Sequence, residues 1–78
     1  MTHGKVYITN GWVAERMNYS RSGVSLLRSG NRQPTLDTME EVAKAFGWPV
    51  EDQVKHRHDW PKQLEVWFLR QYERENSK

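Results

Sequence analysis

Residues that end and begin helices recur along this chain, and their spacing constrains its fold more than any other feature. Asn18, Gly30 and Gly47 are of the types that adopt the left-handed backbone conformation in which helices end. Ser20 and Thr35, which follow two of these positions, have side chains that cap a helix by accepting a hydrogen bond from an early backbone N–H. Only short helices fit between these positions, so the sequence predicts an all-α fold.

We expect five helices and little or no sheet. Pro49 suits the first position of a fourth helix, and Asp59 suits the cap of a fifth, with Pro61 tolerated in its first turn. In the third helix, apolar residues recur at helical spacing, at Leu36, Met39, Val42, Ala43 and Phe46. After a brief extended arm at Val6–Ile8, the expected helices run from Thr9 or Asn10 to Met17, from Arg21 to about Ser29, from the Thr35 cap to Phe46, from Val50 to about Lys55, and from Trp60 to about Arg74.

Composition limits the class of protein. The 78 residues allow one domain, and the absence of cysteine excludes disulfides. The longest apolar run, Val66–Leu69, is far shorter than the roughly 20 residues that cross a bilayer. The residues from Met1 to Lys5 lack the apolar core of a signal peptide. We therefore expect a cytoplasmic protein with no membrane partner.

Charge is distributed unevenly along the chain, although the net charge is only +2. Residues 1–35 carry five Lys or Arg and one Glu, a net charge of +4, whereas residues 36–78 carry seven Lys or Arg and nine acids, a net charge of −2. A basic first half favours a surface that faces a polyanion. The alternative is that a charge of this size on a small domain carries no functional meaning.

The expected second helix has one polar side and one apolar side. At about 100° per residue, Val24 and Leu27 lie together, and Leu26 lies at the edge. A guanidinium can donate two hydrogen bonds to guanine O6 and N7, and a serine hydroxyl suits base edges and phosphates alike. An ordinary solvated surface helix is the alternative. The polar side, within roughly 120°, comprises Arg21, Ser22, Ser25, Arg28 and Ser29.

The segment from Ala14 to Ser25 resembles the helix-turn-helix of phage repressors, Cro proteins and the xenobiotic-response-element class of bacterial regulators. The resemblance continues through Gly30–Leu36 and Val42–Gly47 and covers roughly residues 9–55. Two helices that cross closely need a small residue at their contact, which Ala14 supplies, and Asn18 replaces the usual glycine of the bend. Gly23 departs from expectation, because glycine inside a helix costs about 1 kcal/mol relative to alanine.

The resemblance implies a small lambda-repressor-like domain over residues 1–58 that binds double-stranded DNA. In this family the second helix of the pair enters the major groove and the first crosses the DNA backbone. The implied function is that of a transcriptional repressor of the phage Cro or immunity type. The residues expected to contact bases are Arg21, Ser22, Ser25, Leu26 and Arg28. Those expected to contact phosphates are Asn10, Ser20, Ser29, Asn31 and Arg32.

The last segment, residues 59–78, has more apolar surface than a peripheral helix needs, and Val66 and Leu69 lie outside its main stripe. Family members usually carry a helix before the pair, whereas eight residues precede Thr9 here. We expect the last helix to fill that place, from its own chain or from a partner's, and to extend into a homodimer contact. An ordinary core helix of a monomer is the alternative. The stripe comprises Trp60, Leu64, Trp67, Phe68 and Tyr72.

Other chemistry is disfavoured. His56, His58 and Asp59 lack the ligand number and spacing that are typical of zinc sites. The serines have no base beside them in sequence, and no glycine-rich phosphate loop is present, so we expect neither an enzyme nor a cofactor nor a small-molecule ligand. Two alternative functions stay open: an excisionase-type architectural DNA-binding protein, and an antitoxin-like module that binds another protein through the same fold.

Overall fold

The computed structural model describes residues 7–31 and 33–77, and over these residues the chain is all-α with no strand. The five expected helices are confirmed, with a short 3-10 turn added before the last. Tyr7–Thr9 precede the first helix without regular structure, while Val6 of the expected arm lies outside the described residues. The elements are α1 (Asn10–Met17), α2 (Arg21–Ser29), α3 (Leu36–Phe46), α4 (Val50–Lys55), η1 (Arg57–Asp59) and α5 (Trp60–Asn76).

The first three helices begin at a hydroxyl cap and end at a left-handed residue, as the sequence predicts. The ends are Asn18 (φ 60°), Gly30 (φ 77°) and Gly47 (φ 80°). Local hydrogen bonds therefore fix the bounds of α1, α2 and α3. The capping oxygens and the backbone N–H groups that donate to them are Thr9 with Trp12 (3.1 Å), Ser20 with Gly23 (3.0 Å) and Thr35 with Thr38 (3.2 Å).

The start of α5 differs from the prediction, because the side chain of Asp59 makes no capping hydrogen bond. A side-chain cap needs extended backbone before the helix, whereas Asp59 ends η1 with φ −121° and ψ 29°. Its Oδ2 instead accepts a hydrogen bond from Gln63 Nε2 at 3.3 Å. Pro49 directly precedes α4, whose observed bounds, Val50–Lys55, are those expected from the sequence.

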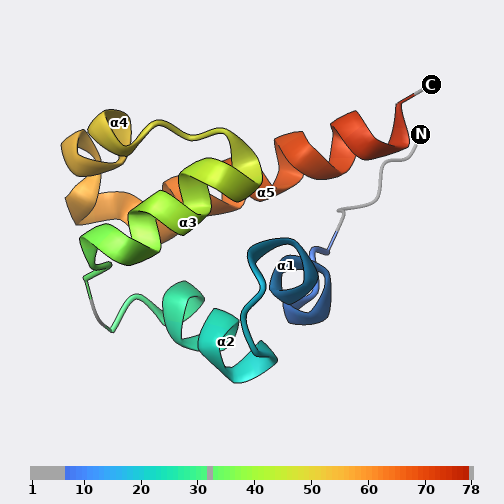
Figure 1. Cartoon of the computed structure of the whole chain (residues 1–78), viewed down its shortest axis with the longest axis horizontal. Coiled ribbons are helices and arrows are strands. Elements are labelled where there is room, and N and C mark those ends of the chain that lie inside the picture. The colour runs from blue at the N-terminus through green and yellow to red at the C-terminus, as the bar shows by residue number, and fades with distance from the viewer. Residues whose placement is uncertain (1–6, 32, 78) are drawn as a thin grey trace.

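The helices pack in two layers around one apolar core. Figure 1 shows α3 and α5 in one layer, α1 and α2 in the other, and α4 at one end. Aromatic rings fill much of the space: Trp48 stacks on Trp60 and Trp67 with centroids 6.2 and 5.9 Å apart, and Phe46 packs 4.9 Å from Phe68. Leu36, which continues the apolar pattern of α3, is nevertheless 60% exposed.

The apolar stripe of α5 packs within its own chain. Trp60, Leu64 and Phe68 are buried in the core. Trp67 and Tyr72 are partly buried, and they pack against Trp48 and Trp12, respectively. The α5 helix therefore completes the core in cis. The homodimer stays a prediction. Val66 and Leu69, expected outside the stripe, are exposed.

One buried polar side chain, Gln53, links α4 to α3 and α5, and sequence reasoning did not identify it. Its Nε2 donates hydrogen bonds to the carbonyl oxygens of Met39 (2.8 Å) and Trp48 (2.9 Å). Its Oε1 accepts one from Trp60 Nε1 at 3.0 Å. Because an unpaired buried amide is costly, these three bonds define where α5 begins relative to α3.

Within the described residues, no helix combines the length and the apolar character that crossing a membrane requires.

Candidate nucleic-acid interface

The α1 and α2 helices form a helix-turn-helix pair joined by residues 18–20. Asn18 takes the left-handed conformation, and the backbone N–H groups of Asn18 and Tyr19 both donate to the carbonyl oxygen of Ala14. Ala14 is 8% exposed and, with Val13, packs in the core cluster that also contains Val24 of α2. A small residue at this point lets the two helices approach closely, as the sequence predicts. With Val24 buried against α1, the polar side of α2 stays exposed.

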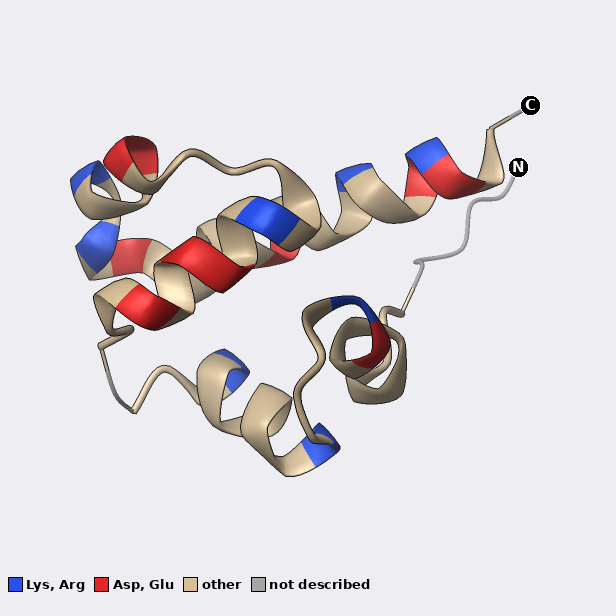
Figure 2. Ribbon diagram, viewed as in Figure 1, with Lys and Arg blue, Asp and Glu red and all other residues tan. Residues whose placement is uncertain are grey.

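Five side chains form a surface that we call the outer face of α2. All five are exposed, and α2 contains no acidic residue. In Figure 2 the charged positions of α2 are basic, whereas acidic positions dominate α3 across the molecule. The outer face therefore combines one guanidinium, three hydroxyls and one apolar group without a competing carboxylate on the same helix. Its members are Arg21, Ser22, Ser25, Leu26 and Ser29.

Gly11 makes room for Arg21 at the start of α1. A Cβ at Gly11 would lie 3.1 Å from Arg21 Nε and 3.3 Å from Nη2, which is a tight contact. The guanidinium of Arg21 consequently lies against the first turn of α1 while the side chain stays exposed. The first turns of the two helices are thus brought together on one side of the pair.

Gly23, which the sequence left unexplained, has a packing reason. A Cβ at this position would lie 3.2 Å from Ser20 Oγ and 3.3 Å from Tyr19 Cδ2. Glycine therefore lets the Tyr19 ring and the capping hydroxyl of Ser20 lie close to α2. The close local contact that Gly23 permits offsets the low helix propensity of glycine.

Arg28 does not belong to the outer face, which corrects the expectation that it contacts bases. Its side chain is only 16% exposed. Nε and Nη2 bind Glu65 of α5 at 2.6 and 2.7 Å, and Nη1 binds the carbonyl oxygen of Ile8 (2.7 Å) and Asn10 Oδ1 (2.9 Å). Arg28 follows Val24 by four residues, so it lies only about 40° around the helix from that buried side chain. This position directs the guanidinium toward α5.

The residues expected at phosphates divide into three groups. Asn10 is half-buried and its Oδ1 accepts a hydrogen bond from Arg28, while a phosphate would have to bind its Nδ2, so its phosphate contact stays a prediction. Ser20, Ser29 and Asn31 are exposed at the two ends of α2, where Ser20 Oγ caps the helix and Ser29 Oγ donates to the Leu26 carbonyl at 2.8 Å. Arg32 lies outside the described residues.

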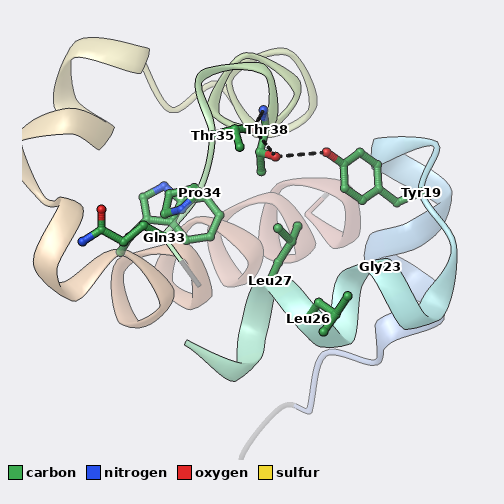
Figure 3. Close-up of a pocket in the computed structure, with 9 residues that line it drawn as sticks. Tyr19, Gly23, Leu26, Leu27, Gln33, Pro34, Thr35 and Thr38 are labelled. Carbon is green, nitrogen blue, oxygen red and sulfur yellow. Dashed lines mark hydrogen bonds between the residues drawn. The ribbon is translucent and has the colours of Figure 1, made fainter. Parts of the chain in front are cut away.

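An apolar groove opens between α2 and α3. It has a volume of about 220 Å³, and its lining includes Leu26 and Leu27 of α2 and Pro34 before α3. Figure 3 shows Tyr19 pointing across one end, where its hydroxyl lies 3.4 Å from Thr38 Oγ1. Sequence reasoning did not identify this groove, because its lining combines residues of α2 with residues 33–35 and Trp60, which only the folded chain brings together.

His56 and His58 lie between α4 and α5, near acidic groups. His56 Nε2 is 3.9 Å from Asp52 Oδ1, and His56 Nδ1 is 3.7 Å from Asp59 Oδ1. His58 Nε2 is 3.8 Å from the same Asp59 oxygen. Across the part of the chain that the structure describes, no three His, Cys, Asp or Glu side chains are grouped as metal ligands would be.

Two ion pairs connect α5 to the helix-turn-helix pair. The first is Arg28 with Glu65, described above. The second joins Arg16 of α1 to Glu75 near the end of α5, with Nε to Oε2 at 2.9 Å and Nη2 to Oε1 at 2.5 Å. The hydrogen bonds from Arg16, and then from Gln71, lower the pKa of Glu75 to about 2, and the pKa of Arg16 is raised in turn.

Comparison of the chain with family models, with curated proteins and with solved structures finds no match. The function proposed below therefore depends on the arrangement of the side chains around α2.

Proposed function

We propose that this protein binds double-stranded DNA in a sequence-dependent manner and places α2 in the major groove. The observation that carries the proposal is the outer face of α2. Its exposed Arg21, Ser22 and Ser25 stand on the polar side of α2, a helix without acids that packs into the core through Val24. The major groove is about 12 Å wide and admits an α-helix of this kind.

The side chains of the outer face have distinct proposed roles. Arg21 donates two hydrogen bonds to guanine O6 and N7, and Ser22 and Ser25 contact neighbouring base edges. Leu26, which is 57% exposed, meets a thymine methyl group, the apolar feature of the major groove. Arg28 has no part in this contact, because its guanidinium binds Glu65 and Asn10 Oδ1.

Phosphates flank this contact at both ends of α2. The first turn of α2 contains no acid, so its backbone N–H groups and the positive end of the helix dipole favour an anion beside Ser20. At the other end, Asn31 is exposed and carries an amide that donates to phosphate oxygens, and Ser29 beside it donates to a phosphate once its hydroxyl leaves the Leu26 carbonyl oxygen. Phosphate contacts at both ends would fix the register of α2 in the groove.

The proposed biological role is that of a cytoplasmic transcriptional repressor of the phage Cro or immunity type. The support is the resemblance of residues 9–55 to that family, together with the exposed outer face of α2. Repression would follow from occupation of an operator and exclusion of polymerase. A homodimer would favour a pseudo-palindromic operator with half-sites about 34 Å apart.

Selection of bound duplexes from a random pool, followed by footprinting of the selected site, tests the proposal. We expect an enriched sequence and a discrete footprint, with much weaker binding to a scrambled duplex of the same composition. Tandem footprints with bending would favour an excisionase-type protein instead. Absence of enrichment and of any footprint would contradict the DNA-binding proposal.

A protein-interaction module is the second candidate, and the apolar groove between α2 and α3 favours it. Leu26 lies at the groove and is largely exposed, which suits an apolar side chain of a protein partner. In that case the selection from random DNA would return no enriched sequence. The same experiment therefore separates the two candidates.

A further inference from the structure

We propose that Glu65 of α5 sets the position of α2 through Arg28, and that this ion pair determines how well the outer face of α2 discriminates between DNA sequences. The inference rests on the proposed DNA-binding function. It makes Glu65 and Arg28 positioning residues, which act on the DNA contact through α2 without touching DNA themselves.

The contacts of Arg28 join three segments at one point. Its guanidinium binds both carboxylate oxygens of Glu65, at 2.6 and 2.7 Å. It also binds the Ile8 carbonyl oxygen and Asn10 Oδ1, at 2.7 and 2.9 Å, where the chain enters α1. The Phe68 ring of α5 lies 5.4 Å from its central carbon. The second half of α2 is therefore held to α5 and to the start of α1 by one side chain.

The position of α2 relative to α5 depends on this side chain because few side chains of α2 are buried. Val24 is the fully buried side chain of α2, and Leu27 is only partly buried. An apolar contact of this size resists separation but does not strongly resist rotation about the helix axis. A two-bond pair between a planar guanidinium and a carboxylate has a defined geometry, so it fixes that rotation.

A substitution at Glu65 distinguishes a positioning role from direct contact with DNA. A carboxylate gains nothing from a DNA backbone, because phosphates repel it. If Glu65 is needed for sequence discrimination, the effect has to travel through Arg28 to α2. The Arg16–Glu75 pair supplies a matched control, since it joins α5 to α1 by the same two-bond chemistry and does not touch α2.

The experiment compares E65Q and E75Q for binding to the selected duplex and to a scrambled duplex of the same composition at one salt concentration. For E65Q we expect the ratio of the two affinities to fall roughly tenfold, the effect of misaligning one base contact. Affinity for the scrambled duplex should stay within about twofold, because phosphate contacts dominate it. E75Q should leave the ratio unchanged, and R28Q should match E65Q with an unchanged salt slope.

Several results would overturn the inference. An E65Q protein with the wild-type ratio would show that the pair does not position α2. Tighter binding of E65Q to both duplexes alike would show that Glu65 acts only as a negative charge. A larger loss for R28Q than for E65Q, with the salt slope lowered by about one, would place Arg28 on the DNA.

Circular dichroism at the binding temperature checks that each variant is folded. If E65Q or R28Q fails to fold, the double variant R28M/E65M replaces them, because removing both partners leaves no uncompensated charge. Its expected ratio equals that of E65Q. A wild-type protein without any preference between duplexes would overturn the DNA-binding proposal itself, whereas an intact wild-type preference with no effect at Glu65 would overturn only this inference.

Discussion

The two helices joined by Arg28 and Glu65, α2 and α5, are stabilised in opposite ways. The 17-residue α5 buries three large side chains, Trp60, Leu64 and Phe68. The nine-residue α2 fully buries only Val24, and most of its other side chains are exposed. Under the proposed function, the difference assigns stability to α5 and DNA recognition to α2. Substitutions in α5 should therefore affect unfolding first, and substitutions on the outer face of α2 should affect binding alone.

The largest expected effect is that of Phe68→Ala on stability. Phe68 is fully buried and packs 4.9 Å from Phe46, so its removal leaves a cavity between α3 and α5. We expect a loss of about 3–5 kcal/mol in the free energy of unfolding. Urea denaturation followed by circular dichroism measures it. Leu69→Ala, the adjacent and exposed position, is the control and should change stability by less than about 0.5 kcal/mol. Equal effects at the two positions would contradict the assignment of α5 to the core.

The next effect in size is that of Arg21→Ala on DNA binding. Loss of a bidentate guanine contact should weaken binding to the selected duplex by about 1–3 kcal/mol and relax one base position. The free energy of unfolding should change by less than about 0.5 kcal/mol, because Arg21 is exposed. Affinity measurements on selected and scrambled duplexes, with urea denaturation alongside, check both expectations.

The control for Arg21→Ala is Arg57→Ala, which removes the same charge from an exposed position in η1. It should weaken binding to both duplexes by a similar small amount. If Arg21→Ala behaves in the same way as Arg57→Ala, the outer face of α2 contributes charge alone and the difference between α2 and α5 has no functional meaning.

Local chemistry explains what the sequence predicts correctly. The bounds of α1, α2 and α3 depend on hydroxyl caps and left-handed residues that act within one turn of the chain, so Ser20, Thr35 and Asn18 could be assigned without a structure. The apolar stripe of α5 is likewise a property of one helix. The prediction fails at Asp59, where the preceding residues form a 3-10 turn that removes the need for a cap.

The candidate site is predicted less completely, because its errors come from contacts between distant segments. Arg28 lies on the border between the polar and apolar sides of α2, and its helix alone does not decide which way it turns. The direction of the Arg28 side chain is set by its hydrogen bonds to Glu65, 37 residues later, and to Asn10 and the Ile8 carbonyl oxygen. Nothing local marks Glu65 as their partner. The four outer-face members expected to contact bases, Arg21, Ser22, Ser25 and Leu26, are exposed.

The smallest expected effect is the pH dependence that Glu75 adds to the hold of α5 on α1. Hydrogen bonds from Arg16 and Gln71 lower the pKa of Glu75 from 4.5 to about 2 in the folded chain. The Glu75 carboxylate of the unfolded chain therefore binds a proton more readily than that of the folded chain. The stabilisation of the folded chain by the Arg16–Glu75 pair is present above pH about 4.5 and is lost as the pH falls to about 2.

The comparison is the melting temperature of the wild type minus that of Glu75→Gln, measured at low salt between pH 7 and pH 2. The difference should favour the wild type at pH 7 and disappear near pH 2. Glu73→Gln, an exposed position two residues away on the same helix, corrects for the loss of one negative charge. A difference that stays constant down to pH 2 would show that the Arg16–Glu75 pair does not hold α5 to α1 in solution, and the Arg28–Glu65 pair and the apolar core would then account for the position of α5.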